Sequence, residues 1–240
     1  MEDINANFAF PLRELENERV KLTPLQPAIY KDALCRICDS NPQLFDFLPF
    51  GGSPDSITAL LYERIGPDPG MAIYAIIDKT RPADPALTHE SSVGQEGAFA
   101  GVFGWLNASA VHLKVEMGFA VVFPAFQRTH IATNAVGLML QYALELPSAG
   151  GLGLRRVQWQ AHTENAASIR LAERMGFVRE GTLRWDRVLR DDKVVGMKSR
   201  EGDPHERKVG RHSAMLAICW DDWEREKERV LTMMDRKLAK

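Results

Sequence analysis

The sequence predicts a single α/β domain built on a mixed sheet of about seven strands. Segments with strand periodicity alternate with segments of helical periodicity along almost the whole chain. Residues 112–161 read as strand, helix and strand with short connections, a crossover that leaves its two strands parallel. The 240 residues are enough for one large domain, and no linker or internal repeat divides them.

Composition narrows the class of protein. Hydrophobic residues make up 45% and charged residues 26%, which is typical of a soluble globular protein. A net charge of −2 gives no basic footprint, so no nucleic-acid partner is expected. No signal peptide follows Met1 and no apolar run reaches the ~18 residues of a membrane span, so we expect a cytoplasmic protein without a membrane partner. Cys35 and Cys38 are expected to be helix thiols, and no metal is expected.

The N-terminal half begins with a polar, irregular stretch, residues 1–17, expected to form an arm on a domain of residues 18–240. Alternation predicts a strand at 19–25, and Pro27 opens a helix to about Ser40. The elements expected next are a helix from Ser53 to Ile65, a central strand at 71–78 that is apolar on both sides, an exposed loop at 79–96, and strands at 98–106 and 112–123 joined by a turn at 107–109.

The C-terminal half continues the alternation. A helix at 131–146 carries apolar residues at helical spacing, and Thr163 or Asn165 caps a helix at 166–175 that Gly176 ends. The remaining expected elements are strands at 156–161, 177–189 and 213–220, a charged loop at 190–210, and a helix at 221–240.

Residues 123–146 predict a phosphate site. An apolar strand ends at Pro124, a short loop with cationic residues follows, and a helix begins near Ile131. The first N–H groups of a helix have no partner within it, and the helix dipole adds positive charge at that end. The arrangement therefore favours a phosphate-bearing ligand.

Two motifs carry a family resemblance over residues 18–220. They are Glu116-Met117-Gly118-Phe119 followed by Pro124, Phe126-Gln127 and Ala132-Thr133, and then Asn165-x-x-Ser168 followed by Glu173-Arg174-Met175-Gly176-Phe177. With the order of the elements, these resemble the GNAT acyltransferase superfamily, and more specifically the RimJ/RimL-type N-acetyltransferases.

The resemblance implies a mostly antiparallel sheet in which a splayed parallel pair of strands forms a wedge for acyl-CoA. It implies transfer of an acetyl group from acetyl-CoA to a primary amine, on a protein N-terminus or a small molecule, by direct attack in a ternary complex. The residues implied to bind acetyl-CoA are Val121, Val122, Phe123, Gln127, Arg128, Thr129, His130, Ile131, Ala132, Thr133, Asn165 and Ser168. A homodimer is left open.

The loop departs from the family pattern, because Arg128 and His130 occupy positions where relatives carry glycine. Glycine allows close backbone approach and unusual dihedrals. The two side chains can instead point away, or add a charge-assisted contact to the phosphates. A degenerate, weakly binding loop is the alternative.

Two residues are candidates for the chemistry. Glu116 is the candidate base, and burial on the strand would raise its pKa; the alternative is a structural glutamate that pairs with Lys114 or Arg155. Many relatives use a tyrosine as the acid, and here that position is Ala172. The RimL-like alternative is Ser168, which could otherwise satisfy only a local backbone group.

Aromatic residues mark the expected acceptor pocket, which the resemblance places at Phe47, Phe50 and Trp105 beside the 190–210 loop. Trp159 and Trp185 are expected in the core. Two further functions stay open: an enzyme that uses a longer acyl donor such as succinyl-CoA, and a catalytically silent acyl-CoA sensor.

Overall fold

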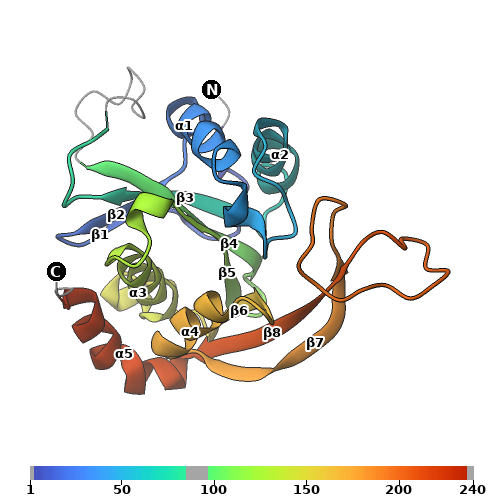
Figure 1. The fold of residues 1–240 in the computed structure, drawn as a ribbon. Coiled ribbons are helices and arrows are strands. Elements are labelled where there is room, and N and C mark those ends of the chain that lie inside the picture. Colours follow the sequence, from blue (N-terminus) through green and yellow to red (C-terminus); the bar gives the residue numbers. More distant parts are fainter. Residues whose placement is uncertain (1–2, 85–96, 237–240) are drawn as a thin grey trace.

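The computed structural model describes residues 3–84 and 97–236, which form a sheet with helices on both faces (Figure 1). The strand order is β1-β2-β3-β4-β5-β6-β8-β7, and only β5 and β6 are parallel. The strands are β1 (Leu15–Glu16), β2 (Val20–Pro24), β3 (Ala72–Asp78), β4 (Ala98–Ser109), β5 (Lys114–Val122), β6 (Arg156–His162), β7 (Val178–Val188) and β8 (Gly210–Cys219). The predicted α/β class and its parallel pair are confirmed.

The helices form two groups, with α1 and α2 over one face of the sheet and α3, α4 and α5 over the other (Figure 1). They are α1 (Pro27–Asp39), α2 (Pro54–Ala59) continued by the π-helical η2 (Leu60–Ile65), α3 (Ile131–Leu144), α4 (Ala166–Arg174) and α5 (Trp220–Asp235). Pro27 and Pro54 stand in the first turns of α1 and α2, where a missing N–H costs no helical hydrogen bond.

Several boundaries differ from the prediction. The N-terminal arm is not wholly irregular, because β1 pairs with β2 and becomes an eighth strand. The predicted turn at 107–109 belongs to β4, and β8 begins three residues earlier than expected, at Gly210. Part of the predicted 79–96 loop, residues 85–96, lies outside the described residues.

The core follows the predicted apolar pattern. Every residue of β3 is buried, as expected of a central strand. Cys35 and Cys38 are buried thiols of α1, and burial raises the pKa of Cys38 to about 12. Trp159 is buried, but the expectation for Trp185 was wrong: this residue is 55% exposed on the edge strand β7, where its ring packs against His212.

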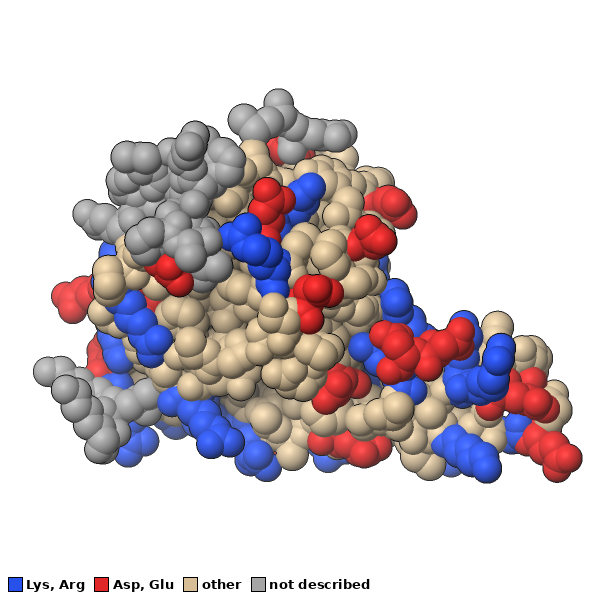
Figure 2. Space-filling view, turned by 45° about the horizontal axis from the view of Figure 1, so that its top comes forward, with Lys and Arg blue, Asp and Glu red and all other residues tan. Residues whose placement is uncertain are grey.

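The β7–β8 connection projects from the body of the molecule (Figure 1). On the face shown in Figure 2, positive and negative side chains are interspersed along this projection. Residues 190–208 therefore present a mixed-charge surface, as the sequence predicts. In the described part of the chain, the helices are too short or too polar to cross a lipid bilayer.

Candidate active site

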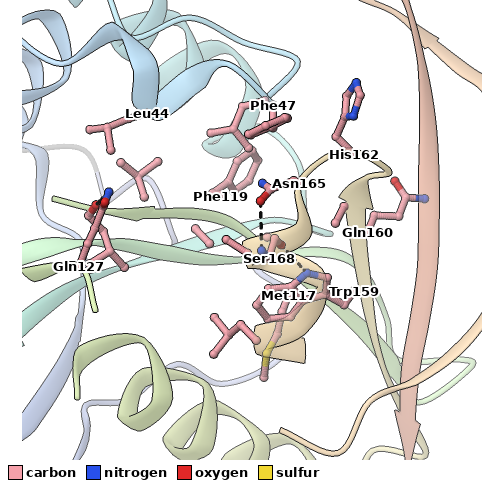
Figure 3. A pocket seen from close by; sticks show the side chains of 18 of the residues that line it. Leu44, Phe47, Met117, Phe119, Gln127, Trp159, Gln160, His162, Asn165 and Ser168 are labelled. Carbon is pink, nitrogen blue, oxygen red and sulfur yellow. Dashed lines mark hydrogen bonds between the residues drawn. The ribbon is translucent and has the colours of Figure 1, made fainter. Parts of the chain in front are cut away.

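A wedge opens where β5 and β6 separate. Their parallel pairing runs from Lys114 with Arg156 to Met117 with Trp159 and then stops. Beyond that point β5 stays paired with β4, and β6 stays paired with β8. A cavity of about 430 Å³ lies between the diverging strands (Figure 3).

A β-bulge shapes the β5 side of this wedge. Between the pairs Val102–Val121 and Gly104–Gly118, one residue of β4 opposes two residues of β5. Phe119 takes a left-handed backbone conformation, with φ of 51°. Such a bulge leaves ladder groups unpaired and bends the strand. A Cβ on Gly104 would lie 2.8 Å from the Phe119 ring, so glycine on β4 makes room for the bulge.

The cavity wall comes from six parts of the chain: the segment after α1, β5, the loop after β5, β6, α4 with its N-cap, and β8. Its residues are Gln43, Leu44, Phe47, Leu48, Met117, Gly118, Phe119, Ala120, Val121, Val122, Pro124, Gln127, Trp159, Gln160, Ala161, His162, Asn165, Ala167, Ser168, Leu171 and Arg211. Figure 3 shows Asn165 and Ser168 on the α4 side and Phe47 and Phe119 across from them. The fold thus brings together five predicted residues of the acyl-CoA site: Val121, Val122, Gln127, Asn165 and Ser168.

The loop after β5 offers main-chain donors. The N–H groups of Phe126 and Gln127 are used within the loop, and that of Asn134 donates to His130. Among the described residues, no hydrogen bond engages the N–H groups of Arg128, Thr129, His130, Ala132 and Thr133, and that of Ile131 has only a 3.4 Å contact with Thr129 Oγ1. Free donors at the start of the 14-residue helix α3 fit a pyrophosphate.

Only one of the two substituted glycine positions needs the conformation that glycine favours. Arg128 has φ of 58°, a left-handed conformation that costs a residue with a Cβ roughly 1–2 kcal/mol. His130 has φ of −70° and is the N-cap of α3, with a helical backbone conformation and no capping hydrogen bond from its side chain. Phe123, in the same connection, is buried in the core, and its N–H donates to the Ala100 carbonyl at 2.9 Å.

The His130 side chain is turned away from the loop. Its Nε2 lies 3.3 Å from the buried Asp78 carboxylate at the end of β3. Burial lowers the pKa of His130, and Asp78 opposes this effect. Arg81 also contacts Asp78, at 3.3 Å, and donates to the Ala125 carbonyl at 3.0 Å. The geometry therefore supports the alternative in which the His130 side chain points away from the phosphates, and the side chain anchors the loop instead.

The start of α4 holds Asn165 and Ser168 in place. Asn165 is the N-cap, and its Oδ1 accepts a hydrogen bond of 3.0 Å from the Ser168 N–H. Ser168 Oγ accepts a hydrogen bond of 2.9 Å from Trp159 Nε1 (Figure 3). Because the hydroxyl oxygen accepts this bond, its own proton is available to a group in the cavity. The hydroxyl does not serve a local backbone group.

Glu116 lies beside the wedge but not in its wall. Its side chain is buried, and its Oε2 accepts a 2.8 Å hydrogen bond from Asn107. Burial raises the pKa of Glu116, and the Asn107 hydrogen bond and the charge of Arg187 oppose this. Among the described residues, no ion pair joins Glu116 to Lys114 or Arg155. The bulge at Phe119 interrupts the strand alternation that would place Glu116 and Ala120 on one face.

The three residues predicted for the acceptor pocket lie in different surroundings. Phe47 lines the cavity, whereas Phe50 is buried against Phe45 and Phe119, and Trp105 is 1% exposed in the core. Sequence reasoning missed four polar residues of the wall: Gln160, His162, Arg211 and Gln43. For the first two, their place at the end of a strand parallel to β5 was an available signal. Arg211 lay between the predicted charged loop at 190–210 and the predicted strand at 213–220, where no pattern distinguished it from its neighbours.

Comparisons with known proteins agree with this geometry. The acetyltransferase (GNAT) domain family matches residues 19–178. A search of curated proteins found no match. A GCN5-related N-acetyltransferase from Brucella melitensis superposes with a TM-score of 0.70 and 22% identity, over 94% of this chain and 86% of the other.

Two further structures share the fold. RimJ of Mycobacterium smegmatis in complex with CoA-disulfide has a TM-score of 0.64 and 17% identity, over 94% of this chain and 95% of that one. RimL, a ribosomal L7/L12 alpha-N-protein acetyltransferase, has a TM-score of 0.63 and 14% identity, over 88% and 96%. The matched domain spans most of the sheet and includes both sides of the wedge, and we conclude that the chain belongs to the GNAT acetyltransferase family.

Proposed function

We propose that the protein is an N-acetyltransferase that moves an acetyl group from acetyl-CoA to a primary amine. The main observation in support of this proposal is that the wedge between β5 and β6 leads directly into a loop of free N–H donors. A ligand with a pyrophosphate and an extended amide arm fits both parts at once. Acetyl-CoA supplies the activated thioester, and the chain supplies binding, orientation and proton handling.

The binding residues act mainly through their backbone. We propose that the edge of β5 at Val121 and Val122 pairs with the amide arm, because β6 no longer pairs with β5 beyond Met117. The N–H groups from Arg128 to Thr133 would hold the pyrophosphate. The Asn165 side-chain amide, whose oxygen caps α4, has its NH₂ group left for the same arm.

Two side chains would handle protons. A neutral amine attacks the thioester carbonyl and then loses a proton, which Glu116 accepts directly or through water. A carboxylate of raised pKa suits this role. The oxyanion would be stabilised by a main-chain N–H near Val121, next to the bulge. Ser168 would give its proton to the departing sulfur, since Trp159 already donates to its oxygen, and would regain a proton from solvent as Glu116 releases its own.

The acceptor is an amine on either a protein N-terminus or a small molecule. The fold similarity to RimL, an alpha-N-protein acetyltransferase, supports the first class. The enclosed wall formed by Phe47, Gln160 and His162 supports a small amine. A cavity of about 430 Å³ also accommodates little beyond the reacting end of an acceptor once the pantetheine is in place.

The test has two stages. In the first, acetyl-CoA and free CoA are titrated while thermal unfolding is followed; we expect both to raise Tm. In the second, release of free thiol is measured over a panel of amines and N-terminal peptides. Turnover with at least one amine supports the enzyme, and Ser168→Ala should lower turnover more than acetyl-CoA affinity. Binding without turnover on any amine would point to the silent sensor, and absence of binding would refute both.

A further inference from the structure

Arg211 is a buried cation in the wall of the wedge. The residue is 4% exposed and lies on β8, beside the cavity. Its Nε donates to Ser213 Oγ at 3.0 Å, and its Nη1 makes a long 3.4 Å contact with the Phe47 carbonyl. Both acceptors are neutral.

Nearby acids do not neutralise Arg211 by contact. Asp186 is committed elsewhere, because its Oδ2 is 3.3 Å from Arg187 Nε and accepts a 2.7 Å hydrogen bond from Ser213 Oγ. Glu116 is held by Asn107. Among the described residues, no carboxylate oxygen lies within 4.0 Å of the Arg211 guanidinium. Asp186 and Glu116 act on it only at longer range.

A buried charge without a contacting counter-ion is costly, and proteins normally pair it or use it. Burial lowers the pKa of Arg211 to about 10, which still leaves the group charged near neutrality. A guanidinium presents N–H donors in a planar fork that matches a carboxylate. The position of Arg211 in a cavity wall gives such an anion a route to it.

His162 provides a second unfilled donor in the same wall. The residue is 1% exposed, and its Nδ1 accepts a 3.1 Å hydrogen bond from the Glu164 N–H. Burial and Arg211 lower the pKa of His162, so the neutral ring carries its proton on Nε2. That nitrogen is buried and makes no hydrogen bond of good geometry with the described residues, although a backbone contact with Val195 acts to raise the pKa.

We propose that Arg211 and His162 form a subsite for a carboxylate carried by one of the two substrates, either the amine acceptor or the acyl group of the donor. The inference rests on the proposed function and narrows it. Arg211 and His162 line the same cavity as Ser168, the proposed proton donor to the sulfur, so the carboxylate would lie near the reacting amine and thioester. An amino acid as acceptor, or a dicarboxylic acyl group such as succinyl as donor, places an acid at that short separation.

The experiment has one arm for each source of the carboxylate. In the acceptor arm, kcat/KM with acetyl-CoA is compared for amino acids and for the matching amines that lack the carboxylate. In the donor arm, succinyl-CoA is compared with butyryl-CoA, which has the same chain length and no charge. We expect the acidic member to be preferred at least tenfold in one arm, and the arm shows which substrate carries the acid.

Variants connect the preference to the residue. Arg211→Gln should reduce the preference to less than threefold, because kcat/KM for the acidic member falls more than kcat/KM for the neutral one, whereas Arg211→Lys should retain part of the preference. Arg179→Gln is the matched control, because this exposed β7 arginine contacts Thr182 and is not in the cavity wall. Thermal unfolding with and without acetyl-CoA checks that each variant folds and binds the donor.

Several results would overturn the subsite. One is the absence of any preference in both arms of the wild-type comparison, which needs no variant. Another is an equal loss for acidic and neutral substrates in Arg211→Gln. Failure of the proposed function gives a different result: no thiol release with any pair, although acetyl-CoA raises Tm. In that case the subsite is tested by binding in the presence of CoA. Acidic amines should then raise Tm more than neutral amines do, and this difference should disappear in Arg211→Gln.

Discussion

At Glu116, the burial that disfavours a carboxylate is also what suits it to accept a proton. Burial raises its pKa above the usual 4.5, while Asn107 donates to its ionised oxygen. We expect wild-type kcat/KM to rise as pH increases through this raised pKa. Glu116→Gln should lower kcat/KM by about 100-fold and lose that pH-dependent rise. A pH–rate profile of both proteins provides the measurement.

The free energy of unfolding should depend on pH in the opposite direction to activity. A raised pKa means that the folded state holds the proton more tightly than the unfolded state, so this stabilisation is present below the unfolded value and lost as pH rises through the folded one. Glu116→Gln keeps an oxygen for Asn107 and should therefore be at least as stable as wild type in urea at pH 8. Glu180→Gln is the control, because Glu180 is an exposed glutamate that pairs with Arg156. If kcat/KM of Glu116→Gln depends on pH in the same way as that of wild type, Glu116 is not part of the mechanism.

The surroundings of a single residue could be predicted from the sequence where a local motif determines them. Asn165 caps α4 and presents Ser168, because an Asx side chain three residues before an N–H fits a helix start. The partner of Ser168 could not be read, since Trp159 lies on a neighbouring strand. The direction of His130 was equally hidden, because it depends on Asp78, far away in sequence.

At the scale of the elements, the β4 glycines permit the bulged strand that walls the wedge. Gly101 has φ of 147°, and a Cβ there would lie 2.1 Å from the Val121 carbonyl oxygen. Gly101→Ala should destabilise the fold by about 2–3 kcal/mol, because backbone must move and the dihedral is strained. It should also weaken acetyl-CoA binding through the displaced Val121. Urea unfolding and a thermal-shift titration measure the two effects.

Gly181→Ala is the control for this substitution. Gly181 lies on the edge strand β7, where an added Cβ meets no atom within 4 Å. We expect its stability to stay within about 0.5 kcal/mol of wild type. If Gly101→Ala is as stable as Gly181→Ala, the wedge wall does not depend on close approach of β4.

Most elements could be predicted because each carries its own periodicity, and α1 and β3 lie within a residue or two of their expected limits. The bulge could not, since a phenylalanine gives no sign of a positive φ. The glycines at 101 and 104, on the opposite strand, were the available signal. β1 has two residues and is too short to show a period; it exists through its pairing with β2.

On the scale of the whole molecule, the C-terminal half holds part of the N-terminal half in position over the wedge. Lys193 is buried and its Nζ donates to the Phe45 carbonyl at 2.7 Å. The adjoining segment provides Gln43, Leu44 and Phe47 to the cavity wall. Lys193→Met should therefore raise KM for the acceptor by about three- to tenfold, a loss of roughly 1 kcal/mol, and leave KM for acetyl-CoA unchanged.

Lys198→Met serves as the comparison, because Lys198 is exposed on the same projection. Steady-state kinetics in both substrates separates the two Michaelis constants. A parallel rise of both constants in Lys193→Met would show general loosening of the fold instead of a local effect on the acceptor side. The whole-molecule arrangement could be expected only through the family resemblance, since no local pattern indicates that residues 42–48 meet β8.

The left-handed Arg128 has a consequence for how this family varies. A loop that recognises phosphate through its main chain constrains the shape of the backbone and leaves the side chains largely unconstrained. Asp78, with His130 and Arg81, anchors that shape from outside the loop. With the proposed pyrophosphate site, the glycine signature can erode while the loop keeps its backbone shape, and a motif that demands glycine would miss such members of the family.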